Sequence, residues 1–200
     1  MSVYKMKARF QDVLRPMTRW LASCGVTANQ VTLFAAAGSI AVGLFLFFMN
    51  DLRWFLLVPL WLFLRMALNA IDGMLAREHD QKSVVGAYLN EIGDVVSDVA
   101  LYAPFALIAP FGPLPIAIII GLAMLTEFVG VLGAMVGASR RYDGPMGKSD
   151  RAVVFGVLGF WIGMGGALPG WLVWLQPLLI LLLVVTTVNR MRNGVAEATA

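Results

Sequence analysis

The chain has 200 residues, of which 60% are hydrophobic and only 14% are charged. A soluble domain usually carries about 25% charged residues, so this composition excludes an ordinary soluble protein and indicates a membrane protein. The net charge is +3, but the basic residues adjoin apolar segments and form no separate basic domain, which argues against nucleic-acid binding. The single cysteine, Cys24, excludes an internal disulfide.

The first predicted element, residues 3–21, is an amphipathic helix lying in the cytoplasmic interface of the membrane. Its apolar residues recur every three to four positions, with Lys and Arg between them. They are Val3, Met6, Phe10, Val13, Met17 and Trp20. We expect this helix to anchor the chain; the alternative is that it also admits lipid substrate.

Six apolar segments follow, each long enough to cross the hydrocarbon core of a bilayer. They cover roughly residues 28–49, 54–77, 84–110, 114–138, 152–168 and 171–190. Their connections are short, so sequential helices should be antiparallel neighbours. The predicted fold class is therefore all-α: a six-transmembrane-helix bundle preceded by an interfacial helix, in a single membrane domain over residues 1–200.

The distribution of Lys and Arg predicts the orientation of the chain. Of the 15 basic residues, all but Arg53 and Arg65 fall on the side that carries both termini. Because cytoplasmic loops are enriched in Lys and Arg, both termini should lie in the cytoplasm. We expect a multi-pass protein of a bacterial-type inner (plasma) membrane.

Polar side chains are concentrated within the second and third apolar segments. Such residues are costly at membrane depth and are usually functional. Helical phase and depth should bring Asn69 and Asp72 together with Asn90 and Asp94, in a pocket open to the cytoplasm. Clustered oxygen ligands favour Mg²⁺ or Mn²⁺, which suits phosphoryl chemistry. The alternative is a polar network that only holds the bundle together.

Three further charges, Arg65, Asp98 and Glu127, should lie near mid-membrane by the same count of depth. An unpaired charge at that depth would be expensive. We therefore predict that Arg65 pairs with Asp98 or with Glu127 as a structural lock.

Residues 69–94 read NAIDGMLAREHDQKSVVGAYLNEIGD, and this segment resembles the signature of the CDP-alcohol phosphatidyltransferase family. The matching positions are Asp72, Gly73, Ala76, Arg77, Gly86 and Asp94. Asn69 and Asn90 stand where the family has aspartates. The segment GVTANQVT before the first span is also similar to family members, so the resemblance covers nearly the whole chain.

The resemblance implies transfer of a phosphatidyl group from CDP-diacylglycerol to an alcohol, with release of CMP, in phospholipid biosynthesis. It makes Asp94 the general base and a metal ligand. Asp72 would be the main ligand of Mg²⁺ or Mn²⁺, with Asn69 and Asn90 as weaker, neutral ligands. Because two negative charges are lost relative to the family, we expect one firmly bound ion, or two held loosely.

The remaining predicted site residues concern the substrates. Gly73, Ala76 and Gly86 lack bulk, so the CDP moiety or a second helix can approach them closely. The planar guanidinium group of Arg77 could bind the diphosphate through paired hydrogen bonds. The alternative is that Arg77 is only one of the positive charges that orient the chain in the membrane. The loop before the fifth span carries cations that could bind a phosphate on the acceptor: Arg140, Lys148 and Arg151. The alternative is that these cations only set the orientation of the chain in the membrane.

The resemblance also implies a homodimer. Small residues on the fourth span offer modest support for it. They are Gly130, Gly133, Ala134, Gly137 and Ala138.

Two other functions compete with the transferase. The two asparagines suggest a catalytically impaired family member that acts as a lipid-nucleotide binding or assembly protein. The intramembrane acids alternatively suggest a small ion-coupled transporter, although such proteins often contain two related halves and this sequence has no clear internal repeat.

Overall fold

The computed structural model describes the backbone of residues 3–200 and the side chains from Arg9 onward; residues 1–2 and the predicted interfacial side chains of Val3 and Met6 lie outside it. Within these described residues the structure is all helical and has no strand. The helices are α1 (Val3–Ser23), α2 (Ala28–Phe48), α3 (Leu57–Glu78), α4 (Val84–Tyr102), α5 (Pro113–Met135), α6 (Lys148–Gly163) and α7 (Leu175–Ala198). Short 3₁₀ turns lie at η1 (Leu52–Leu56), η2 (Ala103–Leu107) and η3 (Gly170–Trp174).

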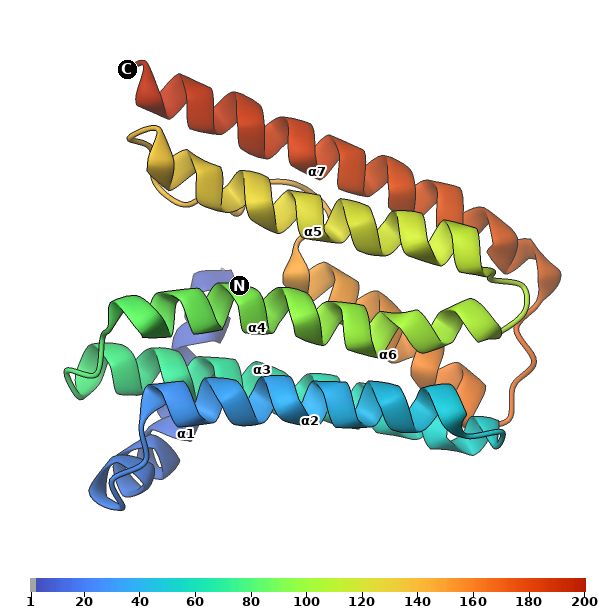
Figure 1. Cartoon of the computed structure of the whole chain (residues 1–200), viewed down its shortest axis with the longest axis horizontal. Coiled ribbons are helices and arrows are strands. Elements are labelled where there is room, and N and C mark those ends of the chain that lie inside the picture. The colour runs from blue at the N-terminus through green and yellow to red at the C-terminus, as the bar shows by residue number, and fades with distance from the viewer. Residues whose placement is uncertain (1–2) are drawn as a thin grey trace.

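The long helices run side by side as a bundle (Figure 1). Helix α2 packs against both α3 and α4, α3 packs against α6, and α5 packs against α7. Aromatic side chains fill the core where α4 meets α6: the rings of Tyr102 and Phe155 stack at 3.9 Å, and Phe105 meets Phe155 edge-on at 5.0 Å. Many large apolar side chains point outward instead, as expected for a surface that faces lipid.

Four helical segments of the described chain are long and apolar enough to cross a membrane: Ala28–Phe48, Leu52–Glu78, Pro113–Met135 and Gly170–Ala198. The protein is therefore a multi-pass membrane protein. Helix α4 falls outside this group because it carries Glu91, Asp94 and Asp98, and α6 because it has only 16 residues. The predicted six crossings remain a prediction.

Capping residues fix where the helices around the predicted pocket begin. The Thr27 hydroxyl accepts a hydrogen bond from the Gln30 backbone N–H at 3.2 Å, and the Gln30 side chain accepts one from the Thr27 N–H at 2.9 Å. This reciprocal pair starts α2. The Ser83 hydroxyl accepts from the Gly86 N–H at 2.9 Å and starts α4.

The connection between α5 and α6 folds back along the bundle. The Arg141 N–H donates to the Gly130 carbonyl at 3.0 Å, and the Met146 N–H donates to the Thr186 hydroxyl at 2.9 Å. Residues 136–147 thus return alongside α5 and α7 before α6 begins (Figure 1). This return explains why α6 is short.

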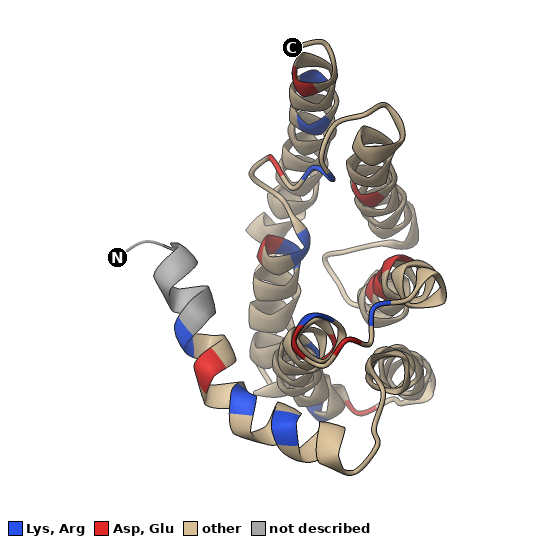
Figure 2. Cartoon of the chain, turned by 90° about the vertical axis from the view of Figure 1, so that its left-hand side faces the viewer, with Lys and Arg blue, Asp and Glu red and all other residues tan. Residues whose placement is uncertain are grey.

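Helix α1 lies across the end of the bundle, where the other helices are seen nearly end-on (Figure 2). Its Leu14 and Leu21 pack on a cluster that contains Met74 of α3. The predicted apolar stripe faces outward: Val13, Met17 and Trp20 are all exposed. This exposed stripe is consistent with contact to lipid, and the interfacial position itself remains a prediction.

Candidate active site

A cavity of about 410 Å³ lies between the first turns of α2 and α4 and the last turns of α3. Except for Asp94, the residues predicted for metal and nucleotide all line it: Asn69, Asp72, Gly73, Ala76, Arg77, Gly86 and Asn90. The structure therefore joins two stretches of sequence that the Glu78–Ser83 connection separates. The cavity is large enough for part of a ligand of nucleotide size.

A hydrogen bond from the neighbouring helix α2 fixes the Asp72 side chain. The hydroxyl of Thr32, on α2, donates to Asp72 Oδ2 at 2.8 Å. Within the described residues Asp72 forms no ion pair, although it is only 6% exposed. A buried carboxylate without a cationic partner usually requires one, so Asp72 is suited to a bound cation.

Asp94 lies next to the cavity through Asn69, whose side-chain amide donates to Asp94 Oδ1 at 3.3 Å. The same oxygen is 3.3 Å from Arg65 Nη2 and forms an ion pair with Lys148 of α6. Arg65 also donates to the Asp94 carbonyl at 2.9 Å. Asp94 is thus oriented by three side chains from two helices, as a catalytic group requires.

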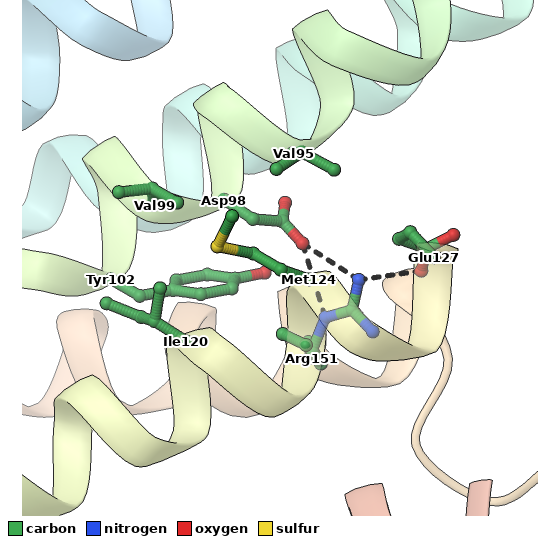
Figure 3. A pocket seen from close by; sticks show the side chains of 9 residues that line it. Val95, Asp98, Val99, Tyr102, Ile120, Met124, Glu127 and Arg151 are labelled. Carbon is green, nitrogen blue, oxygen red and sulfur yellow. Dashed lines mark hydrogen bonds and ion pairs between the residues drawn. The ribbon is translucent and has the colours of Figure 1, made fainter. Parts of the chain in front are cut away.

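The predicted lock at mid-membrane is confirmed for one of its two candidate partners. Arg65 Nη1 lies 2.6 Å from Asp98 Oδ1, and Arg65 is 3% exposed. The other carboxyl oxygen of Asp98 lies 2.9 Å from Arg151 Nη2, which in turn lies 2.9 Å from Glu127 Oε1 (Figure 3). A continuous chain of charges therefore connects Asp94 with Glu127.

The cations predicted for an acceptor phosphate are each paired with a carboxylate. Lys148 contacts Asp94, and Arg151 contacts Asp98 and Glu127. Arg140 reaches both Glu91, at 2.6 Å, and Glu127, at 3.3 Å. The sequence did not predict these pairings because it does not show that residues 136–147 fold back along the bundle.

Gly86 provides for a close approach between helices. A Cβ atom at this position would lie 2.6 Å from Asn29 Oδ1 and 2.9 Å from Ser83 Oγ. Both are closer than real Cβ contacts, so glycine allows the start of α2 to pack against α4. Gly86 also lines the cavity, so its predicted contact with the nucleotide remains a prediction.

Seven residues that line the cavity were not predicted for it, and three of them have polar side chains that the sequence could have indicated or that tie the helices together: Asn29, Thr32 and Gln81. Gln81 ties the α3–α4 connection to the start of α2, because its side-chain oxygen accepts from the Ala28 N–H at 2.7 Å. Asn29 and Thr32 belong to the segment GVTANQVT, so the resemblance of that segment was the signal that could have revealed them.

The oxygen ligands around the cavity suit one hard cation better than two. Asp72 supplies a carboxylate, and Asn69 and Asn90 supply neutral amide oxygens. Within the described residues no group of three or more His, Cys, Asp or Glu could hold a metal ion. The physical reason is that two of the four motif positions are asparagine and that Asp94 already pairs with Arg65 and Lys148.

Small residues on α5 pack within the chain. A Cβ atom on Gly130 would lie 2.8 Å from the Arg141 carbonyl oxygen, and one on Gly133 would lie 2.8 Å from that of Ser139. These two glycines make room for the returning loop, so they no longer support a contact with a second copy. The homodimer remains a prediction.

Comparison with known proteins shows which family this chain resembles. Residues 25–189 match the family described as CDP-alcohol phosphatidyltransferase. The inner membrane protein YnbA of Escherichia coli strain K12 is 44% identical over 196 residues, which cover 96% of each chain. A phosphatidylinositol phosphate synthase of Streptomyces avermitilis is 29% identical over 213 residues, covering 97% of this chain and 85% of its own.

Solved structures show the same fold. The phosphatidylinositol phosphate synthase PgsA1 of Mycobacterium tuberculosis with CDP-DAG bound superposes with a TM-score of 0.74 at 22% identity, covering 90% of this chain and 92% of its own. The same enzyme in complex with manganese and citrate gives a TM-score of 0.73 at 21% identity, covering 90% and 87%. From its sequence match and its motif, the chain belongs to the CDP-alcohol phosphatidyltransferase family and is a phosphatidyltransferase of phospholipid synthesis.

Proposed function

We propose that this protein transfers the phosphatidyl group of CDP-diacylglycerol to the hydroxyl group of a small alcohol. The observation that carries the proposal is the cavity of about 410 Å³ that gathers the motif residues of α3 and α4 beside Asp94. The acceptor oxygen forms a bond to the lipid-bearing phosphorus. The phosphorus–oxygen bond to CMP breaks, and CMP leaves with the bridging oxygen.

Asp94 takes the proton of the acceptor hydroxyl in this mechanism. Asn69 and Arg65 hold the carboxylate in place, at 3.3 Å each. Lys148 contacts the same oxygen from α6, so the acceptor approaches where α3, α4 and α6 meet. A positioned base of this kind contributes about 10²–10⁴-fold to rate.

A divalent cation, Mg²⁺ or Mn²⁺, completes the proposed site. Asp72 would bind it with the amide oxygens of Asn69 and Asn90, since these three residues line one cavity. The cation would neutralise the diphosphate and the charge on the departing CMP. The manganese in the structure of the Mycobacterium tuberculosis synthase supports this choice of ion.

The nucleotide would occupy the wider part of the cavity. Gly73, Ala76 and Gly86 line it without bulk, and Arg77 and Lys82 stand beside them. Neither cation pairs with a carboxylate of the described chain, so both are open to a diphosphate. The structure of a synthase with CDP-DAG bound, which has the same fold, supports CDP-diacylglycerol as the ligand.

The proposal includes the arrangement in the membrane. Six helices, α2 to α7, would cross it with both termini in the cytoplasm, and α1 would lie in the interface. The basic residues at the ends of α1, α3 and α7 support this orientation. The protein would act as a homodimer, which chemical cross-linking in membranes would test.

The test is CMP release from CDP-diacylglycerol by purified protein in detergent, with an acceptor panel, with Mg²⁺ or Mn²⁺, and with chelator. We expect acceptor-dependent release that chelator abolishes. Asp94→Asn should lower kcat by about 10²–10⁴-fold, because the base is lost while its size and contacts to Arg65 are kept. Size-exclusion chromatography would confirm that the variant is folded.

Two outcomes would contradict the proposal. An unchanged kcat in Asp94→Asn would remove Asp94 from the role of base. Binding of CDP-diacylglycerol without CMP release, whatever the acceptor, would indicate a lipid-nucleotide binding protein instead.

A further inference from the structure

Three arginines surround one buried carboxylate, that of Glu127 on α5. Arg151 Nη2 lies 2.9 Å from Glu127 Oε1, and Arg140 Nη2 and Arg190 Nη1 lie 3.3 and 3.4 Å from Oε2. The Glu127 side chain is 8% exposed. Converging guanidinium groups of this kind are typical of sites that bind phosphate. Here a side chain of the protein itself supplies the anion.

Arg151 has no donor left for another anion. A guanidinium group has five N–H donors. The Nε and Nη2 groups of Arg151 donate to Asp98 Oδ2 at 3.2 and 2.9 Å, and Nη2 also donates to Glu127. Its Nη1 group donates to the Thr126 hydroxyl at 3.2 Å and to the Met146 carbonyl at 3.3 Å. Arg151 is also only 2% exposed, so it cannot turn toward a substrate.

Arg190 is committed through two of its three nitrogen atoms. Its Nε donates to the Asp143 carbonyl at 3.3 Å, and its Nη1 donates to the Thr126 carbonyl. Arg190 is 2% exposed. The third arginine, Arg140, is shared between Glu91 and Glu127.

The charges of the connected network nearly balance. Five cations, Arg65, Arg140, Lys148, Arg151 and Arg190, face four carboxylates, Glu91, Asp94, Asp98 and Glu127. A phosphate monoester brings about −1.5 to −2 charges at pH 7. At most one positive charge is left over, so a phosphate placed here would be short of partners.

There is also no room for a phosphate inside the cluster. The cavity bounded by Asp98, Glu127 and Arg151 has a volume of about 10 Å³ (Figure 3). That volume admits at most one water molecule. An external anion could reach Arg151 there only if the Glu127 side chain were removed.

We propose that Glu127 occupies the arginine site that a phosphate on the acceptor would need, and that the acceptor is therefore an alcohol without a phosphate group. This inference rests on the proposed function and narrows its substrate class. Glu127 is a specificity-determining residue in this proposal. It excludes phosphorylated acceptors both by filling the space and by neutralising the arginines.

The first experiment tests the anion site without catalysis. The unfolding midpoint Tm of the full-length protein in detergent is measured with inorganic phosphate against chloride at equal ionic strength, with excess CMP in both samples to fill the proposed nucleotide site. Phosphate should leave the wild type unchanged. Glu127→Ala should lower Tm because it removes a carboxylate shared by three arginines and leaves Arg190 without an ion-pair partner, and phosphate should restore it.

A matched variant and a replacement variant accompany this measurement. Glu197→Gln removes a carboxylate that pairs with Arg141 outside the cluster, and phosphate should not raise its Tm. Glu127→Ser also vacates the space and replaces Glu127→Ala if that variant does not fold. Phosphate stabilisation of the wild type, or no stabilisation of either Glu127 variant, would overturn the proposal.

The second experiment compares each alcohol with its own phosphate ester, such as glycerol with glycerol 3-phosphate and inositol with inositol 1-phosphate. The wild type should favour the free alcohol in kcat/KM by at least about tenfold. Glu127→Ala should narrow that preference. Faster CMP release with the phosphate esters by the wild type would overturn the inference and leave the transferase intact.

If no acceptor leads to CMP release from CDP-diacylglycerol, the proposed function fails, and the assignment of an acceptor class fails with it. The phosphate titration would still decide whether Glu127 occupies an anion site. The two failures are therefore distinguishable.

Discussion

Asn69 and Asn90 are the residues that set this chain apart from the family signature it otherwise matches. Both line the cavity beside Asp72, so they remain in place to contact a ligand. An amide oxygen coordinates a hard cation more weakly than a carboxylate because it carries no charge. These two substitutions therefore change the electrostatics of the site and not its shape.

Restoring the two carboxylates should strengthen metal binding. We expect the double variant Asn69→Asp, Asn90→Asp to bind two Mn²⁺ ions where the wild type binds one, as measured by the electron paramagnetic resonance signal of free Mn²⁺. The matched control is Asn29→Asp, which adds a charge to the same cavity outside the motif. Two tightly bound ions in the wild type would contradict the weakened site.

At the scale of elements, the returning loop of residues 136–147 decides where α6 begins. Hydrogen bonds from Arg141 to Gly130 and from Met146 to Thr186 hold it against α5 and α7. Because of this return, α6 starts inside the bundle, and its first residue, Lys148, reaches Asp94.

Gly130 should be essential for this packing. A methyl group there would lie 2.8 Å from the Arg141 carbonyl oxygen, so Gly130→Ala should destabilise the protein by about 1–3 kcal/mol. Gly121→Ala, on the same helix, is the control because its Cβ would meet nothing within 4 Å. Thermal unfolding in detergent would compare them, and equal Tm values would show that the loop is not held at Gly130.

A second property of the loop depends on pH. Two hydrogen bonds from Arg141, at 2.8 and 3.0 Å, lower the pKa of Asp143. A carboxylate with a lowered pKa stabilises the fold above its ordinary pKa, and this contribution is lost as the pH falls through the lowered value. Asp143→Asn should therefore lower Tm at pH 7, with a difference that shrinks in acid. A difference that grew in acid would exclude this pair as the cause.

For the whole molecule, the orientation in the membrane can be tested with the native cysteine. Cys24 is the only cysteine and is exposed, beside the predicted cytoplasmic end of α2. A membrane-impermeant maleimide should label it in inverted vesicles but not in intact cells. The variant Cys24→Ser, Arg53→Cys moves the thiol to the opposite end and should give the reverse pattern. Labelling of Cys24 from outside intact cells would invert the proposed orientation.

The sequence by itself predicted most of the helices and the motif residues that gather at the cavity. Long apolar segments bounded by turns marked the helices, and the spacing of Asn69, Asp72, Asn90 and Asp94 placed their side chains on facing helices. These features are local, because helical periodicity decides which face a residue occupies. The cavity and the pairing of Arg65 with Asp98 were predictable for the same reason.

Only the tertiary structure decided how the remaining charges are partnered. Nothing in the order of residues shows that the loop after α5 turns back, because that path depends on glycines of α5 and on Thr186 of α7. The return carries Arg140 and Lys148 to carboxylates of α4 and α5. Residues that look like free cations for a phosphate in the sequence are therefore neutralised in the fold. Pairing between distant helices is a matter of three-dimensional packing, which one-dimensional spacing does not contain.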